Sequence, residues 1–359
     1  MPLQIVIVGA GILGLTTALT LSEKLTDEHE IYVIGEYGPH DSRLNITMSN
    51  FHEYTSPWAG AHFRPFPSAT EQDRKEMKMT RETLQYFAEV ASAHPESSIQ
   101  FVDGIEVLED PNDLYRAISY GYKEGMSNFT NMNDQEGRLV CKYKTWIVNT
   151  IVYLQYIYRQ LVIKDVKFIQ ARLKSLKEVA SMFTSHPVII NCSGTGLQWD
   201  TGYDPQCYPI RGQTLLIKPP RSFELDKTIT YQLADGSWIF TIPRPFNGGV
   251  ILGGTKQAND SYLGVRQEDT DHLIKLGNKY FPDLKKTNPV TGESYFDIER
   301  VNVGLRPARV GGINTSVEFH DGYSVLNNYG AGGMGYELSY GASLQVYKNL
   351  IELLNKSKL

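Results

Sequence analysis

The stretch QIVIVGAGILG at residues 4–14 decides the fold, because it joins a short apolar run to a glycine-rich turn. Residues 4–8 predict a strand and residues 15–25 predict an amphipathic helix. Between them lies a GxGxxG motif, with its glycines at Gly9, Gly11 and Gly14. This order of strand, turn and helix is typical of a dinucleotide-binding βαβ unit, and the alternative interpretation is an ordinary glycine turn.

Each glycine of the motif has a physical reason. Gly9 permits the tight turn, Gly11 lets the backbone approach a pyrophosphate, and Gly14 lets the helix lie close on the strand. A second predicted strand at residues 30–34 leads to Glu36. Its carboxylate is placed to accept a hydrogen bond from a ribose hydroxyl, although it comes later than the usual ~20 residues. The motif does not distinguish FAD from NAD(P).

Composition and charge exclude several classes of protein. A chain of 359 residues predicts ~2 domains or one large domain with an insertion. With 41% hydrophobic and 21% charged residues, it is neither disordered nor a coiled coil. The formal net charge of −5 argues against a nucleic-acid partner, and no apolar run reaches the ~18 residues of a membrane span. Cys141, Cys192 and Cys207 lack metal-ligand spacing, so we expect no metal.

The rest of the chain predicts an α/β plus β fold, in which a Rossmann-like nucleotide-binding domain is interleaved with an antiparallel-sheet substrate domain. The nucleotide-binding domain is assigned to residues 1–60, 150–200 and 300–359, and the substrate domain mainly to residues 61–149 and 201–299. Short β-branched and aromatic runs from Tyr208 to Gly254 predict antiparallel strands. Strands before Gly304 and at residues 323–327 are expected to complete that sheet.

Three further segments are interpreted from local patterns. Residues 68–91 predict a long helix, with Ser68 as N-cap and Glu71 completing a capping box. Residues 94–141 are interpreted as a lid or insertion. A second glycine-rich turn at residues 329–336 opens a terminal helix that runs to about Leu354.

The last three residues, Ser357, Lys358 and Leu359, match the tripeptide that a peroxisomal import receptor reads. The polar residues before them favour exposure, and a chance ending is the alternative. We therefore expect the peroxisomal matrix as the location and the import receptor as a partner. A dinucleotide enzyme in that compartment suggests an oxidase that makes hydrogen peroxide.

Motifs along the whole chain resemble the peroxisomal D-amino acid oxidase and D-aspartate oxidase family, especially its yeast and fungal members. They are GAGILGL at 9–15, TSPWAGA at 55–61, NCSG at 191–194, YPIRGQ at 208–213, IPRP at 242–245, GGT at 253–255, VGLRPAR at 303–309 and NYGAGGMG at 328–335. They occur in the family's order, so the resemblance is specific.

The resemblance implies non-covalent FAD and oxidation of a D-amino acid to an imino acid, which hydrolyses to a 2-oxo acid and ammonia. Oxygen then reoxidises the flavin and gives hydrogen peroxide. The residues that it assigns to FAD are Gly9, Ala10, Gly11, Ile12, Leu13, Gly14, Glu36, Ser56, Ala59, Gly60, Leu173, Ser193, Gly194, Gly332, Gly333, Met334, Gly335, Tyr336 and Glu337.

Two catalytic positions are implied by the resemblance. Arg306 takes the place of the arginine that pairs with the substrate α-carboxylate, so one enantiomer directs its Cα hydrogen to flavin N5. Gly333 lies in the turn that presents the terminal helix to the flavin, where a helix N-terminus stabilises the negative charge left by hydride transfer. No side-chain base is needed, because the hydrogen leaves as hydride from the neutral-amine substrate.

Three positions bear on substrate choice. Phe240 replaces a tyrosine that is usual in oxidases of neutral D-amino acids, so a hydroxyl contact is missing. Lys256 occupies a position where D-aspartate oxidases carry a cation, and a cation there would pair with a side-chain carboxylate. His62 adds a second donor. These residues favour an acidic substrate, D-aspartate or D-glutamate.

Three alternatives stay open at this point. The first is an oxidase of neutral D-amino acids, with Lys256 directed to solvent and His62 a satisfied core histidine. The second is an NAD(P)-dependent dehydrogenase, which the N-terminal motif alone would support. The third is a non-catalytic nucleotide-binding protein, which Arg306 and the two glycine-rich turns argue against. The oligomeric state is not predicted.

Overall fold

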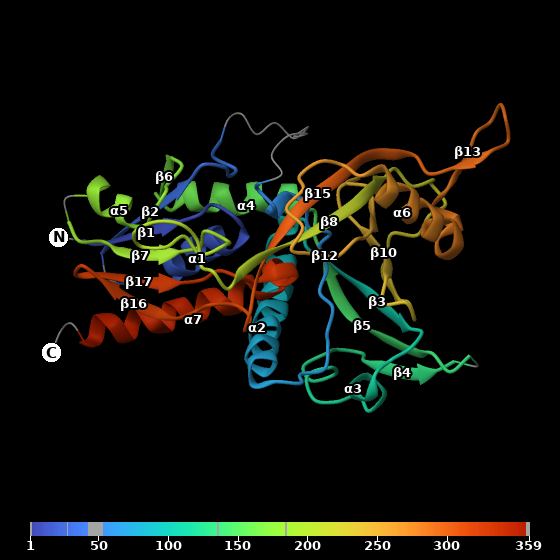
Figure 1. The fold of residues 1–359 in the computed structure, drawn as a ribbon, viewed down its shortest axis with the longest axis horizontal. Helices are drawn as coiled ribbons and strands as arrows, with labels where there is room; N and C mark the ends of the chain where they lie inside the picture. Colours follow the sequence, from blue (N-terminus) through green and yellow to red (C-terminus); the bar gives the residue numbers. More distant parts are fainter. Residues whose placement is uncertain (1, 27, 42–52, 135, 184, 357–359) are drawn as a thin grey trace.

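The computed structural model describes residues 2–26, 28–41, 53–134, 136–183 and 185–356 (Figure 1). Its first layer is a six-stranded sheet with the order β16-β17-β7-β1-β2-β6. The strands are β1 (Leu3–Val8), β2 (His29–Gly35), β6 (Lys167–Gln170), β7 (Val188–Asn191), β16 (Val317–His320) and β17 (Tyr323–Asn327). Neighbouring strands are parallel except β16 and β17. The predicted βαβ unit is confirmed.

Helices cover both faces of this sheet. Successive side chains of β1 point to opposite sides, and both sets are apolar, so each face packs against helices. Ile5 and Ile7 join a core with α1 (Ile12–Lys24), α4 (Thr150–Ile163) and α7 (Gly335–Lys356). Val6 and Val8 face the other side and pack with Val179 of α5 (Lys177–Met182). Residues 12–21 of α1 are all buried. The expected amphipathic pattern is therefore wrong, since α4 and α7 cover the face of α1 that the sheet leaves free.

The second layer is a nine-stranded sheet, ordered β12-β8-β11-β10-β9-β3-β5-β4, with β15 on the other edge of β8. Its strands are β3 (Gln100–Leu108), β4 (Thr130–Asn133), β5 (Leu139–Ile147), β8 (Cys207–Ile217), β9 (Lys227–Gln232), β10 (Trp238–Pro243), β11 (Val250–Gly253), β12 (Gln257–Ala258) and β15 (Ile298–Arg309). The strands predicted between Tyr208 and Gly254 pair antiparallel, as expected. The parallel pairing of β3 with β9 makes the sheet as a whole mixed. α6 (Gln267–Tyr280) packs on it, while β13 (Lys286–Thr287) and β14 (Ser294–Tyr295) form a separate hairpin that projects from the molecule (Figure 1).

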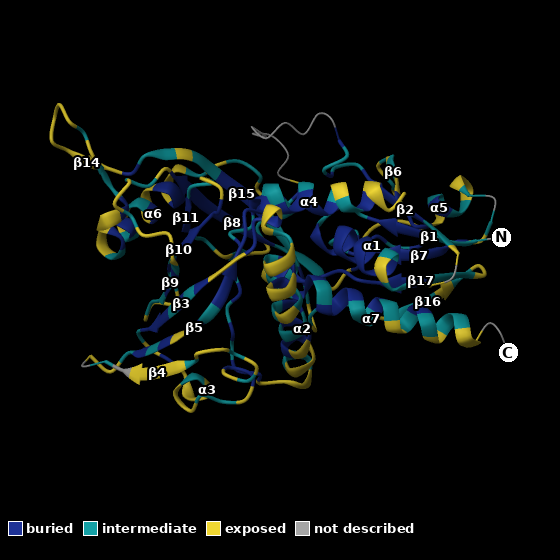
Figure 2. Cartoon of the chain, turned by 180° about the vertical axis from the view of Figure 1, so that it is seen from behind, coloured by how far each residue is buried: buried dark blue, intermediate teal, exposed yellow. Residues whose placement is uncertain are grey.

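The long helix α2 (Glu71–Ala93) stands between the two sheets and exposes one face to solvent (Figures 1 and 2). Thr70 is its N-cap and Asp73 completes the capping box, so the predicted box of Ser68 and Glu71 is wrong by two residues. The pairs Ser68–Glu71 and Thr70–Asp73 have the same spacing, and the extended backbone at Thr70 makes this residue the cap. The helix packs on α7 at Gly341, whose amide donates to Thr83 Oγ1 at 3.1 Å.

Three assignments of segments differ from the expectation. Residues 94–141 contain β3 and the short helix α3 (Asp113–Arg116), and β3 lies inside the second sheet, so the lid or insertion interpretation is wrong. Residues 323–327 form β17, which pairs with β7 in the first sheet. β15 crosses the predicted boundary at residue 300, because it pairs with β8 along its whole length. The other domain limits stay predictions.

Some expectations concern what the chain lacks or lie beyond the described ranges. No helix within those ranges is long and apolar enough to cross a membrane. The same ranges hold no group of three or more His, Cys, Asp or Glu side chains arranged for a metal ion. Ser357, Lys358 and Leu359 fall outside the described residues, so the predicted import signal is not placed.

The contact of Gly14 with Gly9 yields a stability prediction. A Cβ at Gly14 would come within 1.8 Å of the Gly9 carbonyl oxygen, so alanine at this position forces α1 away from β1. We expect Gly14→Ala to lower the free energy of unfolding by about 1–3 kcal/mol, the usual cost of overpacking. Urea unfolding followed by circular dichroism measures this change. Glu23→Ala, on the exposed side of α1, is the control and should stay within about 0.5 kcal/mol of the parent.

Candidate active site

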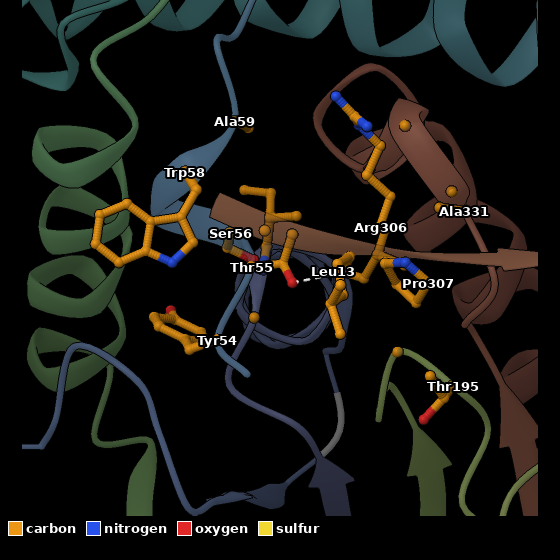
Figure 3. A pocket seen from close by; sticks show the side chains of 18 of the residues that line it. Leu13, Tyr54, Thr55, Ser56, Trp58, Ala59, Thr195, Arg306, Pro307 and Ala331 are labelled. Carbon is orange, nitrogen blue, oxygen red and sulfur yellow. Dashed lines mark hydrogen bonds between the residues drawn. The ribbon is translucent and has the colours of Figure 1, made fainter. Parts of the chain in front are cut away.

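One cavity of about 1040 Å³ is lined by residues of both sheets (Figure 3). Arg306 reaches it from β15, Thr195 from the loop after β7, and Ala331 from the turn before α7. Every residue predicted to bind cofactor or substrate lines this cavity except Gly14, which packs beneath the turn. The fold thus gathers positions that are as much as 328 residues apart in sequence, from Gly9 to Glu337.

The N-terminal turn forms one end of the cavity. Gly9 has a φ of 111°, and a Cβ there would lie 2.3 Å from the Cys192 carbonyl oxygen, so only glycine fits. Ile12 and Leu13, the first residues of α1, line this end, and Ile12 N donates to Ser56 Oγ at 3.0 Å. Tyr54 donates its hydroxyl to the Ala10 carbonyl at 2.9 Å. This narrow cradle with a helix N-terminus suits a phosphate group.

Glu36 borders the same end, just after β2. Arg172, which follows β6, places its Nη1 3.4 Å from a Glu36 carboxylate oxygen and 3.8 Å from Glu53. Leu173 lies beside Arg172 on the cavity wall. The carboxylate is therefore on the cavity, as predicted, with a cation beside it that the sequence analysis did not anticipate.

Arg306 lies on β15 of the second sheet. Its guanidinium lies over Gly212 of β8, where a Cβ would come within 2.4 Å of both terminal nitrogens. It donates from Nη1 to the Thr255 carbonyl at 3.2 Å. Burial lowers the pKa of Arg306 from its ordinary value, but the group stays a cation at physiological pH because an arginine pKa starts above 12.

Two more cations lie near Arg306, around the indole of Trp238. Arg64 Cζ is 4.5 Å from the ring centroid and Lys256 Nζ is 5.5 Å from it. Arg64 donates to Glu106 Oε1 at 2.5 Å, and this carboxylate is buried. Partial burial lowers the pKa of Lys256, and repulsion from Arg64 and Arg306 lowers it further.

His62 and Phe240 form a stacked pair on the cavity wall, with ring centroids 6.4 Å apart. His62 Nδ1 is buried and has no hydrogen-bond partner among the described residues. Burial, with a smaller contribution from Arg64, lowers the pKa of His62 to about 3. The imidazole is therefore neutral at physiological pH and adds polarity but no charge to this pocket.

The first turn of α7 closes the cavity between the two ends. Tyr336 donates its hydroxyl to the Ser56 carbonyl at 2.9 Å, which fixes the turn against the segment after Thr55. Gly333 belongs to the 3₁₀ turn Gly332–Met334 that precedes α7, and a Cβ there would lie 3.6 Å from Arg306 Cδ. The turn that leads into α7 therefore borders the same space as Arg306.

Several residues on or beside the cavity escaped the sequence analysis. Arg244 is buried and donates to the carbonyls of Pro57, Ala59 and Gly60, so it holds the Ala59–Gly60 segment along the cavity. Arg64 and Lys256 both contact the Trp238 ring although they are distant in sequence, and no local pattern indicates that contact. Arg244 lies within the IPRP motif, which is the one sequence signal that could have drawn attention to it.

The fold and the cavity define a class of protein, a nucleotide-dependent oxidoreductase whose substrate pocket adjoins a second sheet. A family model described as "DAO: FAD dependent oxidoreductase" matches residues 4–346. The chain belongs to this family of FAD-dependent enzymes, which confirms the resemblance and FAD as the cofactor. The NAD(P)-dependent alternative is thereby excluded.

Similar proteins include a D-aspartate oxidase of Talaromyces thermophilus, 33% identical over 100% of this chain and 97% of that protein. A D-amino-acid oxidase of Schizosaccharomyces pombe is also 33% identical, over 96% and 94% of the two chains. Among solved structures, an L-proline dehydrogenase from P. horikoshii has a TM-score of 0.68 at 13% identity, covering 98% of this chain and 94% of its own. A glycine oxidase from Bacillus cereus has a TM-score of 0.67 at 14% identity, covering 98% and 95%. Both solved structures are similar to this chain in fold.

The contact of Arg306 with Gly212 makes a prediction about substrate binding. Gly212→Ala would displace the guanidinium, because the added methyl occupies its position. A shift of about 1 Å in a positioning group lowers kcat/KM by roughly 100-fold. Steady-state kinetics with a D-amino acid measures the loss. FAD binding, whose predicted phosphate cradle is at Gly9 and Gly11, is the control. Unchanged kcat/KM with intact FAD binding would contradict the assignment.

Proposed function

We propose that this enzyme oxidises D-amino acids and prefers those with an acidic side chain, D-aspartate or D-glutamate. One observation carries the proposal. Arg306 and Lys256 line the same cavity, and repulsion between them lowers the pKa of Lys256. Among the described residues neither cation forms an ion pair with a carboxylate, so the two fit a ligand with two carboxylates.

FAD fits the cavity as the described residues form it. The cradle at Gly9 and Gly11 and the N-terminus of α1 would receive the pyrophosphate, and Glu36 would accept from the ribose. Ser56, Ala59, Gly60, Leu173, Ser193 and Gly194 would line the remaining length. The turn from Gly332 to Glu337 would meet the flavin ring.

In the proposed reaction Arg306 holds the α-carboxylate through a bidentate pair and so orients the substrate. When bound, FAD would supply the two-electron acceptor for the hydride from Cα, and O₂ would be the final oxidant that gives hydrogen peroxide. The amide groups of the turn that leads into α7, including that of Gly333, would stabilise the negative charge that the hydride brings. The imino acid hydrolyses to the 2-oxo acid and ammonia, so one D-amino acid, one O₂ and one water give three products.

The side-chain pocket supports the acidic preference. Arg64 is fixed by Glu106 and Trp238, and its position repels the Lys256 ammonium. A side-chain carboxylate between these cations would relieve that repulsion. The second candidate is an oxidase of neutral D-amino acids, favoured by the exposure of Lys256, whose ammonium could remain hydrated.

Turnover of D-aspartate and D-alanine separates the two candidates. We expect a higher kcat/KM for D-aspartate, and Lys256→Ala should raise its KM by about 10–100-fold, the value of one charge-assisted contact. The KM for D-alanine should change little. Peroxide production measures both rates, and Lys218→Ala, an exposed lysine after β8, is the matched control. A higher kcat/KM for D-alanine in the parent enzyme would contradict the acidic preference.

The lowered pKa of Lys256 makes this preference depend on pH. The ammonium loses its proton at a lower pH than a free lysine does, so attraction to a side-chain carboxylate weakens as pH rises. We expect the ratio of kcat/KM for D-aspartate over D-alanine to fall with rising alkaline pH. Taking the ratio cancels the ionisation of the α-amino group. In Lys256→Arg the ratio should stay level, because arginine does not titrate there.

We further propose import into the peroxisomal matrix through Ser357, Lys358 and Leu359, which supports an oxidase that produces peroxide. A fluorescent protein fused before the full chain should colocalise with a peroxisomal marker in yeast. Deleting the tripeptide should disperse the fluorescence through the cytosol. Colocalisation that survives the deletion would contradict this signal.

A further inference from the structure

We propose that Glu337 binds FAD as a neutral carboxylic acid, donating a hydrogen bond from Oε2 to an acceptor atom of the flavin ring. This rests on the position proposed above for FAD. Glu337 lies in the first turn of α7 and lines the cavity. Its Oε2 is buried and has no hydrogen-bond partner among the described residues. Buried polar atoms are normally satisfied, so this oxygen points to a partner supplied by the ligand.

The charged and titratable groups around Glu337 are committed elsewhere. Arg64 is paired with Glu106 at 2.5 Å, although its backbone supplies a hydrogen bond to the Glu337 carboxyl group. Arg81, on α2, donates from Nε to the Glu124 carbonyl and from Nη2 to the Gly121 carbonyl, both at 2.6 Å. Tyr143, on β5, is buried and neutral, since burial raises its pKa. Neither arginine makes an ion pair with Glu337 within the described ranges.

The balance of these effects keeps the carboxyl protonated. Burial raises the pKa of Glu337 to about 8, and the charge and backbone hydrogen bond of Arg64, with the charge of Arg81, lower it only in part. A helix N-terminus also favours the ionised form, so burial outweighs the interactions that would stabilise a charge. A protonated carboxyl has an O–H donor, whereas an ionised one accepts only.

The proton gives Glu337 a role in cofactor binding and reduction. A carboxylate at this position would repel the negative charge that hydride transfer brings to the flavin, and a neutral acid would donate to the ring instead. Because FAD then binds the protonated form, its affinity falls as Glu337 ionises. With a pKa of about 8, Kd for FAD rises about tenfold between pH 7 and pH 9 if the ionised form does not bind.

The test is a titration of the full-length, FAD-free chain with FAD at pH values from 6.5 to 9, followed by flavin fluorescence. The parent should lose about tenfold in affinity across this range. Glu337→Gln, which keeps a neutral donor, should bind with a nearly constant Kd close to the parent's value at pH 7. Glu337→Ala should also give a constant Kd, but a weaker one. Glu352→Gln, on the exposed side of α7, is the matched control and should follow the parent.

Two results would overturn the inference: a parent Kd that does not change with pH, or a Glu337→Gln variant that keeps the parent's pH dependence. Circular dichroism at each pH checks that all variants remain folded. The titration contains no D-amino acid, so it is independent of the proposed substrate. A pH-dependent Kd without D-amino acid turnover would leave this inference standing and contradict the proposed function, and turnover with a constant Kd would do the reverse.

Discussion

Strand β15 is paired with β8 from Ile298 to Arg309, and the remainder of the site depends on this ladder. The pairing places Gly304 opposite Gly212 and Arg306 opposite Ile210, so the guanidinium comes to rest over a residue without a side chain. Near its end, Ala308 forms a bridge with Ala331 in the turn that leads to α7. One antiparallel pairing thus fixes Arg306, the arginine proposed to bind substrate, and the turn into α7 that adjoins it.

The electrostatics of the cavity follow from this arrangement. Burial of Arg306 and partial burial of Lys256 lower both pKa values, which means that the protein disfavours these charges in the absence of a partner. For the proposed anionic substrate, affinity would come from these local charges, because the chain as a whole carries −5. Burial also raises the pKa of Glu337 and lowers that of His62, which disfavours a charge on either group.

Local sequence patterns were sufficient to predict a segment whose structure depends on its own consecutive residues. The strand at Leu3–Val8, the glycine turn and the second strand were predicted from consecutive residues, because their apolar pattern and backbone requirements are local. The predictions were wrong where the structure of a segment depends on residues distant in sequence. β17 has the pattern of any short strand, and its pairing with β7 is a contact between segments that are distant in sequence. The helix cap was predicted at Ser68 and lies at Thr70, because the pairs Ser68–Glu71 and Thr70–Asp73 have the same spacing and the sequence does not distinguish them.

The sequence by itself determined the nucleotide-binding βαβ unit, the family and the identity of Arg306, Lys256 and His62 as residues to examine, because motif glycines and single charges are visible without a partner. Only the tertiary structure decided that Arg64, Trp238 and Lys256 form one group, that Gly212 seats Arg306, and that Glu337 has an unsatisfied oxygen. Burial and contact between distant segments depend on strand register, and these set the pKa values and the free hydrogen-bonding capacity of a site.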